Sequence, residues 1–284
     1  MKSDSLFKQI SITTLCLWLA IFALIPNLLV IGVSFLERGD INLVELHFTF
    51  NNYLRLVNTL YLKIFWHSFY LAAISTFICF LIGYPFAYIL AQLESRFKPA
   101  LLCLVIIPFW TSSLIRSYAM VAILKAKGLL NTFLLSIGII HEPFHLLYSN
   151  TAVLIGLVYN LLPFMILPLY TNIEKLDTNL IDAARDLGAN KITAFFKITL
   201  PLTKSGIIAG TMLVLLPAMS MFYIPDLLGG AKSLLIGNLI KNQFLSARDW
   251  PMGCAVSITL TLLMGIMLLI YFRQKSDIAK QELL

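Results

Sequence analysis

Six long apolar segments constrain the fold of this chain more than any other feature of its sequence. Each is close to or above the roughly 20 residues that an α-helix needs to cross the hydrocarbon core of a bilayer. Inside hydrocarbon every backbone N–H and C=O group must be satisfied within the protein, and strands of a closed barrel would be only about ten residues long. The sequence therefore predicts an all-α membrane protein with six transmembrane helices. They cover Ile12–Leu36, Ser68–Leu93, Ala100–Leu124, Thr151–Tyr170, Gly206–Ile224 and Gly253–Phe272.

Composition supports lipid as the main surroundings of the chain. Apolar residues make up 59% of the 284 residues and charged residues only 12%, whereas soluble domains are roughly half apolar and a quarter charged. The net charge of +7 comes from Lys and Arg residues scattered over the loops, so we expect no nucleic-acid partner. Positive residues favour the cytoplasmic side of a membrane. Their bias towards both ends of the chain and towards the loops 92–99 and 172–205 predicts that these segments are cytoplasmic.

No set of side chains has the spacing of an enzyme site or a metal site. The cysteines lie in or at the ends of predicted spans, where we expect no disulfides, and the histidines lie in predicted outer loops. His141 and His145 are four residues apart, but Pro143 between them favours a loop over a helix. The Gly-rich Lys-Ser/Thr loop that cradles ATP phosphates is also missing. We therefore expect a non-catalytic chain with no metal and no cofactor of its own.

A polar segment between the fourth and fifth spans has the pattern of a short surface helix. Asp177 or Thr178 can cap its start, and Asp182 and Arg185 are spaced to pair on its polar face. Gly188 suits the left-handed residue that ends a helix.

The residues around this short helix leave two interpretations open. Ala183 and Ala184 form a small-residue patch that permits close approach of a partner, and Asn190 can cap a second turn. Pro201 breaks the chain just before the fifth span. The segment is either a docking site for a soluble protein or an amphipathic connector on the membrane surface.

The spacing of this segment resembles the EAA loop of bacterial ABC importer permeases. The matching positions are Asp182, Ala183, Ala184, Gly188, Ile198, Leu200 and Pro201, with Asp182 where the family has Glu. The resemblance implies an ABC type-1 importer permease fold in a bacterial inner membrane. It also implies that the 177–201 loop is a cytoplasmic coupling helix for an ATPase subunit. We accordingly expect an N-terminal helix and outer loop over 1–66, a permease domain over 67–272 and a cytoplasmic tail over 273–284.

Further segments resemble the permeases of spermidine/putrescine importers. They are Pro108–Arg116, Gly156–Tyr159, Leu162–Met165 and Ile240–Phe244, while Glu174–Asp177 and Leu227–Lys232 resemble the B-type subunit in particular. The resemblance implies a polyamine substrate, a second homologous permease, an outer binding protein and an ATPase dimer that binds ATP and Mg. An ABC permease for a different small solute is the alternative.

Two pairs of residues are our candidates for contact with such a substrate. A flexible polycation calls for carboxylates and for aromatic faces that attract ammonium groups. Trp110 lies in the third span with Ser113 about one turn on, and Tyr223 precedes Asp226 by three residues at the end of the fifth span. The alternatives are helix or lipid packing for Trp110 and a solvated loop acid for Asp226.

Arg116 and the prolines of the spans are candidates for structural or gating roles. Arg116 is a charge inside a predicted span, so it either pairs with an acid or extends to the interface. It would repel a polycation, so we do not expect it to bind one. Pro108 and Pro163 remove helix hydrogen bonds and kink their spans, either as ordinary packing or to form a gate.

Two other classes of protein fit the sequence less well. An ion-coupled secondary transporter would be expected to carry Asp or Glu inside the membrane, and the predicted spans have essentially none. An integral-membrane enzyme would need a catalytic constellation near the interface, and the sequence offers no candidate for one.

Overall fold

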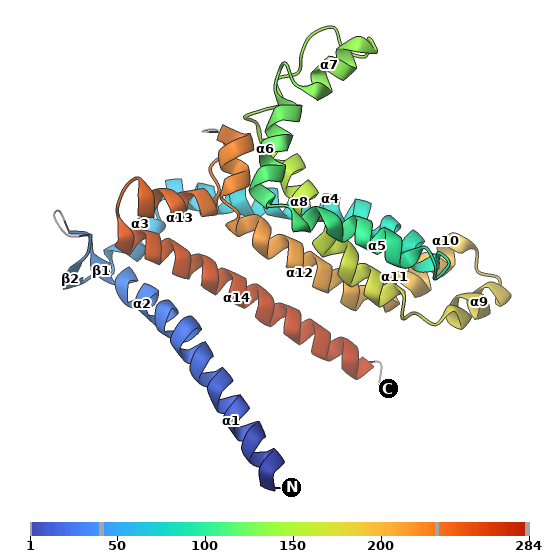
Figure 1. Cartoon of the computed structure of the whole chain (residues 1–284), viewed down its shortest axis with the longest axis horizontal. Coiled ribbons are helices and arrows are strands. Elements are labelled where there is room, and N and C mark those ends of the chain that lie inside the picture. The colour runs from blue at the N-terminus through green and yellow to red at the C-terminus, as the bar shows by residue number, and fades with distance from the viewer. Residues whose placement is uncertain (1, 40–42, 231–232, 282–284) are drawn as a thin grey trace. The chain divides into compact units, whose positions relative to one another are not determined.

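The computed structural model describes residues 2–39, 43–230 and 233–281. Figure 1 shows that these residues are mainly helical. They divide into two compact units, of which unit 1 contains the chain up to Lys63 together with Leu239–Leu263. Unit 2 contains Ile64–Asn238 and the chain from Met264 onwards. Residues 231 and 232, which end the segment Leu227–Lys232 that resembles the B-type subunit, and residues 282–284 of the predicted tail lie outside the described residues.

The helical membrane fold predicted from hydropathy is confirmed. Among the described residues five helices are long and apolar enough to cross a membrane, and a pair bent by 65° makes a sixth when counted as one span. The five are Ser11–Ser34, Thr59–Gln92, Ser113–Ser136, Asn150–Ile173 and Trp250–Arg273, and the bent pair is Lys191–Leu202 with Lys204–Ser220.

The prediction of one continuous third span over Ala100–Leu124 is wrong. Pro108 lacks an N–H group and cannot continue the helical hydrogen-bond ladder, and the backbone becomes extended at Thr111. The N–H and hydroxyl groups of Thr111 both donate to the Pro108 carbonyl, at 3.3 and 2.8 Å, which closes off the helix end. The segment therefore consists of a helix, a short 3-10 turn and a second helix. They are α5 Lys98–Ile106, η2 Ile107–Trp110 and α6 Ser113–Leu124.

Unit 1 combines the N-terminal helices with a small hairpin. Its elements are α1 Lys2–Leu19, η1 Ala20–Leu24, α2 Ile25–Ser34, β1 Leu36–Glu37, β2 Glu45–Phe48, α3 Asn51–Leu56, the start of α4 Thr59–Gln92, most of α13 Ile236–Leu245 and the first part of α14 Trp250–Gln281. The antiparallel hairpin sets Leu36 opposite Phe48. Asn52 on α3 donates to the carbonyls of Ser34 and Leu36, at 3.0 and 2.8 Å, and so ties α3 to the end of α2.

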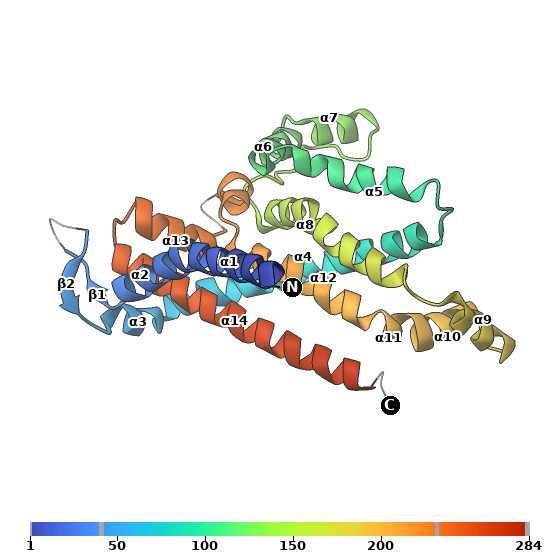
Figure 2. The ribbon, with the colours of Figure 1, turned by 60° about the horizontal axis from the view of Figure 1, so that its bottom comes forward.

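Unit 2 holds most of the remaining helices. Besides α5, η2 and α6 these are α7 Leu129–Ser136, α8 Asn150–Ile173, α9 Thr178–Asp186, α10 Lys191–Ala194, η3 Phe195–Thr199, α11 Leu200–Leu202, α12 Lys204–Ser220 and η4 Pro225–Gly229. In Figures 1 and 2 α8 and α12 run side by side, and α9 lies past the end of α8. The fifth span is shorter than predicted, because α12 ends at Ser220 and the chain is extended at Met221.

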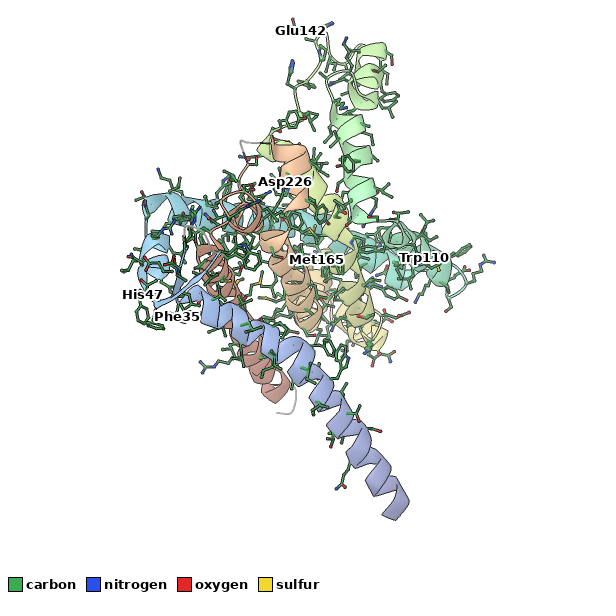
Figure 3. All side chains as sticks on the ribbon, turned by 60° about the vertical axis from the view of Figure 1, so that its left-hand side comes forward. Phe35, His47, Trp110, Glu142, Met165 and Asp226 are labelled. Carbon is green, nitrogen blue, oxygen red and sulfur yellow. The ribbon has the colours of Figure 1, made fainter. Side chains whose placement is uncertain are left out.

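Met165 on α8 is the centre of the helix packing in unit 2. Its side chain is fully buried and lies inside the unit in Figure 3. A Cβ atom at Gly83 on α4 would lie 3.1 Å from Met165 Cγ, and one at Gly210 on α12 would lie 2.8 Å from Met165 Sδ. Small residues allow close approach of helices in a membrane, where packing rather than water drives association. The two glycines therefore bring α4 and α12 onto α8.

Candidate coupling segment and translocation cavity

The start and end of α9 follow from hydrogen bonds within a few residues. The Asp177 carboxylate accepts from the Asn179 N–H group at 3.0 Å and caps the helix. The helix ends at Gly188, whose φ of +85° is left-handed, and Asp182 pairs with Arg185 at 3.7 Å. These predicted local features are confirmed.

The chain after α9 is attached to α4 by aromatic side chains. Asn190 caps α10 by accepting from the Thr193 N–H group at 2.7 Å, as predicted. The Phe195 ring meets the Tyr84 and Tyr88 rings edge-on, at centroid distances of 5.6 and 5.8 Å. These contacts hold η3 on α4, so α9 projects from an anchored base.

The residues that match the EAA loop differ in exposure. Asp182, Ala183, Gly188 and Pro201 are exposed, Ile198 and Leu200 are half-buried, and Ala184 is buried. The four exposed residues are available to a partner. The three buried or half-buried residues attach the segment to its own chain. The small-residue patch predicted from both alanines is therefore reduced to Ala183.

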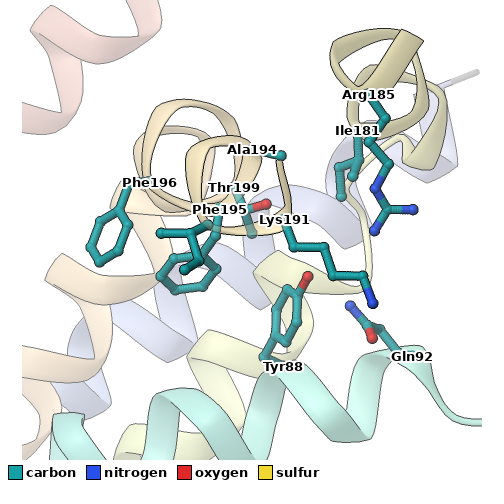
Figure 4. Close-up of a pocket in the computed structure, with 10 residues that line it drawn as sticks. Tyr88, Gln92, Ile181, Arg185, Lys191, Ala194, Phe195, Phe196 and Thr199 are labelled. Atoms are coloured by element: carbon teal, nitrogen blue, oxygen red, sulfur yellow. The ribbon is translucent and has the colours of Figure 1, made fainter. Parts of the chain in front are cut away.

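A cavity of about 340 Å³ separates α9 from the end of α4. Figure 4 shows the long side chains of Arg185 and Lys191 extending into this space near Gln92 of α4. Sequence reasoning did not single out Lys191 or Gln92. Apolar and aromatic side chains, among them Ile181, Tyr88 and Phe195, complete the lining. The two helices are therefore separated by a cavity of mixed character and are not packed against each other there.

An ion pair joins the base of α5 to the end of α8, just before α9. Lys98 Nζ lies 3.2 Å from Glu174 Oε1. A hydrogen bond from Tyr170, followed by the bond and charge of Lys98, lowers the pKa of Glu174 below its ordinary value of 4.5. Glu174 therefore carries its negative charge at neutral pH.

A second cavity, of about 600 Å³, brings together most of the candidate path residues. Its lining residues come from η2, α6, α8 and the stretch after α12. They are Phe109, Trp110, Thr111, Ser112, Ser113, Arg116, Asn160, Phe164, Met221 and Tyr223. Trp110, Ser113 and Tyr223 thus share one site, although the break in the third span separates Trp110 from Ser113. Pro108, Pro163 and Arg116 line a neighbouring apolar cavity of about 320 Å³.

Arg116 contacts aromatic faces rather than an acid. Its guanidinium carbon lies 5.1 Å from the Phe109 ring centroid and 5.9 Å from that of Tyr159, distances at which a ring face attracts a cation. None of the ion pairs within the described part of the chain includes Arg116, and its Nε atom is buried without a hydrogen-bond partner there. The described residues therefore provide no acid partner for Arg116, and its extension to the interface stays a prediction.

Asp226 does not line the second cavity. It lies on η4 and accepts a hydrogen bond from Asn238 Nδ2, which also donates to the Phe222 carbonyl at 2.8 Å. Figure 3 shows Asp226 and Trp110 on different parts of unit 2. Any contact between Asp226 and the substrate remains a prediction.

Six residues of this cavity were missed by sequence reasoning, namely Phe109, Thr111, Ser112, Asn160, Phe164 and Met221. Phe109, Phe164 and Met221 are apolar residues that nothing in the sequence separates from lipid-facing neighbours. Asn160 did have a signal, since a lone amide in the apolar run of α8 is expensive in a membrane and usually faces the protein interior.

The fold is that of a membrane chain of a bacterial ABC transporter. The crystal structure of a bacterial ABC transporter involved in the import of the acidic polysaccharide alginate superposes with a TM-score of 0.78 at 18% identity, over 98% of this chain and 97% of that chain. Residues 83–276 match the family model of the binding-protein-dependent transport system inner membrane component. The chain belongs to this family.

Relatives align over nearly the whole chain. The spermidine/putrescine transport system permease protein PotB of Salmonella typhimurium is 54% identical over 273 residues, covering 96% of this chain and 95% of the relative. The PotB protein of Escherichia coli K12 is 55% identical over 262 residues, covering 92% and 95%. The PotB protein of Haemophilus influenzae is 54% identical over 267 residues, covering 94% and 93%.

Proposed function

We propose that this chain is the permease subunit of an ATP-driven spermidine/putrescine importer in a bacterial inner membrane. The observation that carries the proposal is the identity of 54–55% to spermidine/putrescine permeases over more than nine-tenths of the chain. The subunit is non-catalytic and forms half of the translocation path. A second, homologous permease forms the other half, and an outer binding protein delivers the polyamine.

The chemistry of the cavity of about 600 Å³, which we assign to the translocation path, suits a polyamine. Trp110, Phe164 and Tyr223 offer aromatic faces to ammonium groups and apolar contact to the methylene spacers. No carboxylate of the described residues lines this cavity. We propose that the second permease supplies the acids that balance the substrate charge.

Coupling runs through the 177–201 loop. The exposed side of α9, with Asp182, Ala183 and Gly188, docks on the ATPase subunit, which binds ATP and Mg. Closure of the ATPase dimer pushes α9 towards α4 across the gap that Arg185 and Lys191 span. Both termini lie in the cytoplasm in this arrangement.

The test is transport by the assembled complex. We expect the chain to co-purify with an ATPase subunit and the reconstituted complex to take up labelled spermidine into vesicles only when ATP and the binding protein are present. A complex that forms but neither transports nor responds to spermidine or putrescine refutes the substrate and leaves an ABC permease for a different solute. Failure to co-purify with any ATPase refutes the coupling role.

A further inference from the structure

Asn160 lines the cavity of about 600 Å³ and carries a buried hydrogen-bond acceptor that has no partner among the described residues. The residue is 3% exposed and lies on α8. Its Nδ2 atom donates to the Gly156 carbonyl at 2.9 Å. Only the NH₂ end of an amide can donate to a carbonyl, so this bond fixes the orientation of the side chain. The opposite atom, Oδ1, is buried and has no hydrogen-bond partner among the described residues.

A buried acceptor without a donor is unfavourable. Leu at this position would pack without that penalty. The cavity around Asn160 has a volume of about 600 Å³, which is large enough to admit a ligand. Trp110, Phe164 and Tyr223 are among the residues that line it. A cationic hydrogen-bond donor that enters the cavity among these aromatic residues would satisfy the Oδ1 acceptor of Asn160.

We propose that Asn160 Oδ1 accepts a hydrogen bond from a protonated amine of the transported polyamine, and that Asn160 is a specificity-determining residue of the path. This inference rests on the proposed function. A neutral amide oxygen orients the amine without the full attraction of a carboxylate. The Arg116 guanidinium on the same cavity repels the cation. The site therefore holds the amine weakly, as passage through a transport path requires.

The experiment measures the concentration dependence of spermidine uptake by the complete reconstituted complex. Asn160→Leu removes the acceptor and preserves approximate volume. Loss of a hydrogen bond to a charged donor should raise the apparent KM for spermidine about tenfold or more, with a smaller change in the maximal rate. Asn160→Gln keeps an amide acceptor and should recover part of the affinity.

The matched control is Asn27→Leu. Asn27 Nδ2 donates to the Ala23 carbonyl at 2.8 Å, which is the same bond to the residue four positions earlier, but Asn27 is exposed on α2. Its substitution should leave the KM unchanged. If Asn160→Leu does not assemble, Asn160→Ala serves as the acceptor-free variant.

The outcomes separate the two proposals. The role of Asn160 is overturned, while spermidine import stands, if the acceptor-free variant has the KM of the wild type. It is also overturned if the KM of the Asn27→Leu control or of the Asn160→Gln variant rises as much as that of Asn160→Leu. If the wild-type complex itself does not import spermidine, the proposed function fails and the role of Asn160 falls with it.

Discussion

At Gly188 the backbone takes a φ of +85°, where a side chain would bring its Cβ close to the following carbonyl oxygen. A Cβ atom built there meets no other group within 4 Å. The backbone conformation, and not the available space, therefore selects glycine at the end of α9. A residue that cannot adopt this conformation would redirect the chain between α9 and α10.

Substitution of Gly188 tests whether this turn transmits motion to the permease. Gly188→Val strains the left-handed turn by about 1–2 kcal/mol, so we expect uptake of spermidine per ATP hydrolysed to fall while the protein still inserts into the membrane. Gly188→Asn is the control, since Asn tolerates this conformation. The ratio of uptake to ATP hydrolysis in vesicles is the measurement, and normal coupling in the Val variant would contradict a docking role.

The hydrogen bonds of single residues were predictable from the sequence where both partners lie within a few positions of each other. Asp177 and Asn190 cap helices through the second or third N–H group after them, and such bonds follow from residue type and spacing. Asp226 accepts a hydrogen bond from Asn238, twelve positions away. Distant partners of this kind depend on how helices pack, so the sequence does not reveal them.

Among the elements, α8 and α12 depend on glycine for their close approach. Met165 Sδ would lie 2.8 Å from a Cβ atom at Gly210, and the Met165 carbonyl oxygen would lie 3.3 Å from it. Met can move its side chain, but the backbone of α8 cannot yield without separating the two helices. The pair is therefore sensitive to any larger residue at Gly210.

Gly210→Leu should destabilise the protein by about 1–3 kcal/mol because it overpacks the contact with α8. Gly265→Leu on α14 is the matched control, since a Cβ atom at Gly265 meets nothing within 4 Å. Thermal unfolding of the two detergent-purified variants beside the wild type measures the difference. Equal midpoints for both variants would show that Gly210 is not required for packing.

Element types and possible break points at prolines were predictable from the sequence, but which prolines break a span was not. Hydropathy predicts apolar helices because lipid contact depends on each residue alone. The break at Thr111 and the 65° bend before α12 depend on which carbonyl groups find new donors near a proline. Pro85 lies inside an unbroken α4, so a proline alone does not decide where a span ends.

For the whole molecule, the arrangement of loops on the two sides of the membrane follows from the spans. The loop before α8 and the helix α9 after it are separated by one apolar helix of 24 residues, Asn150–Ile173. At 1.5 Å per residue this helix is about 36 Å long, enough to cross the roughly 30 Å hydrocarbon core. The two flanking segments must then lie on opposite sides.

Cysteine labelling in intact spheroplasts tests this arrangement. We expect a membrane-impermeant maleimide to label Glu142→Cys from outside and to label Asp182→Cys only after permeabilisation, because the bias of positive charge predicts a cytoplasmic 172–205 loop. The four native cysteines are free thiols and are first replaced by alanine. Labelling of both positions from the same side would mean that α8 does not cross the membrane.

Hydropathy and short-range capping were enough to predict a helical membrane chain with a short capped helix after its fourth span, because each depends on one residue or on neighbours within a turn. The docking role of that helix stays a prediction. The domain limits at 66 and 272 remain predictions. Packing between helices determined which residues line the cavity, because it brings together Trp110, Asn160 and Tyr223 from segments far apart in the chain. An apolar residue looks the same in sequence whether it faces lipid or a cavity, so only the contacts between helices distinguish the two.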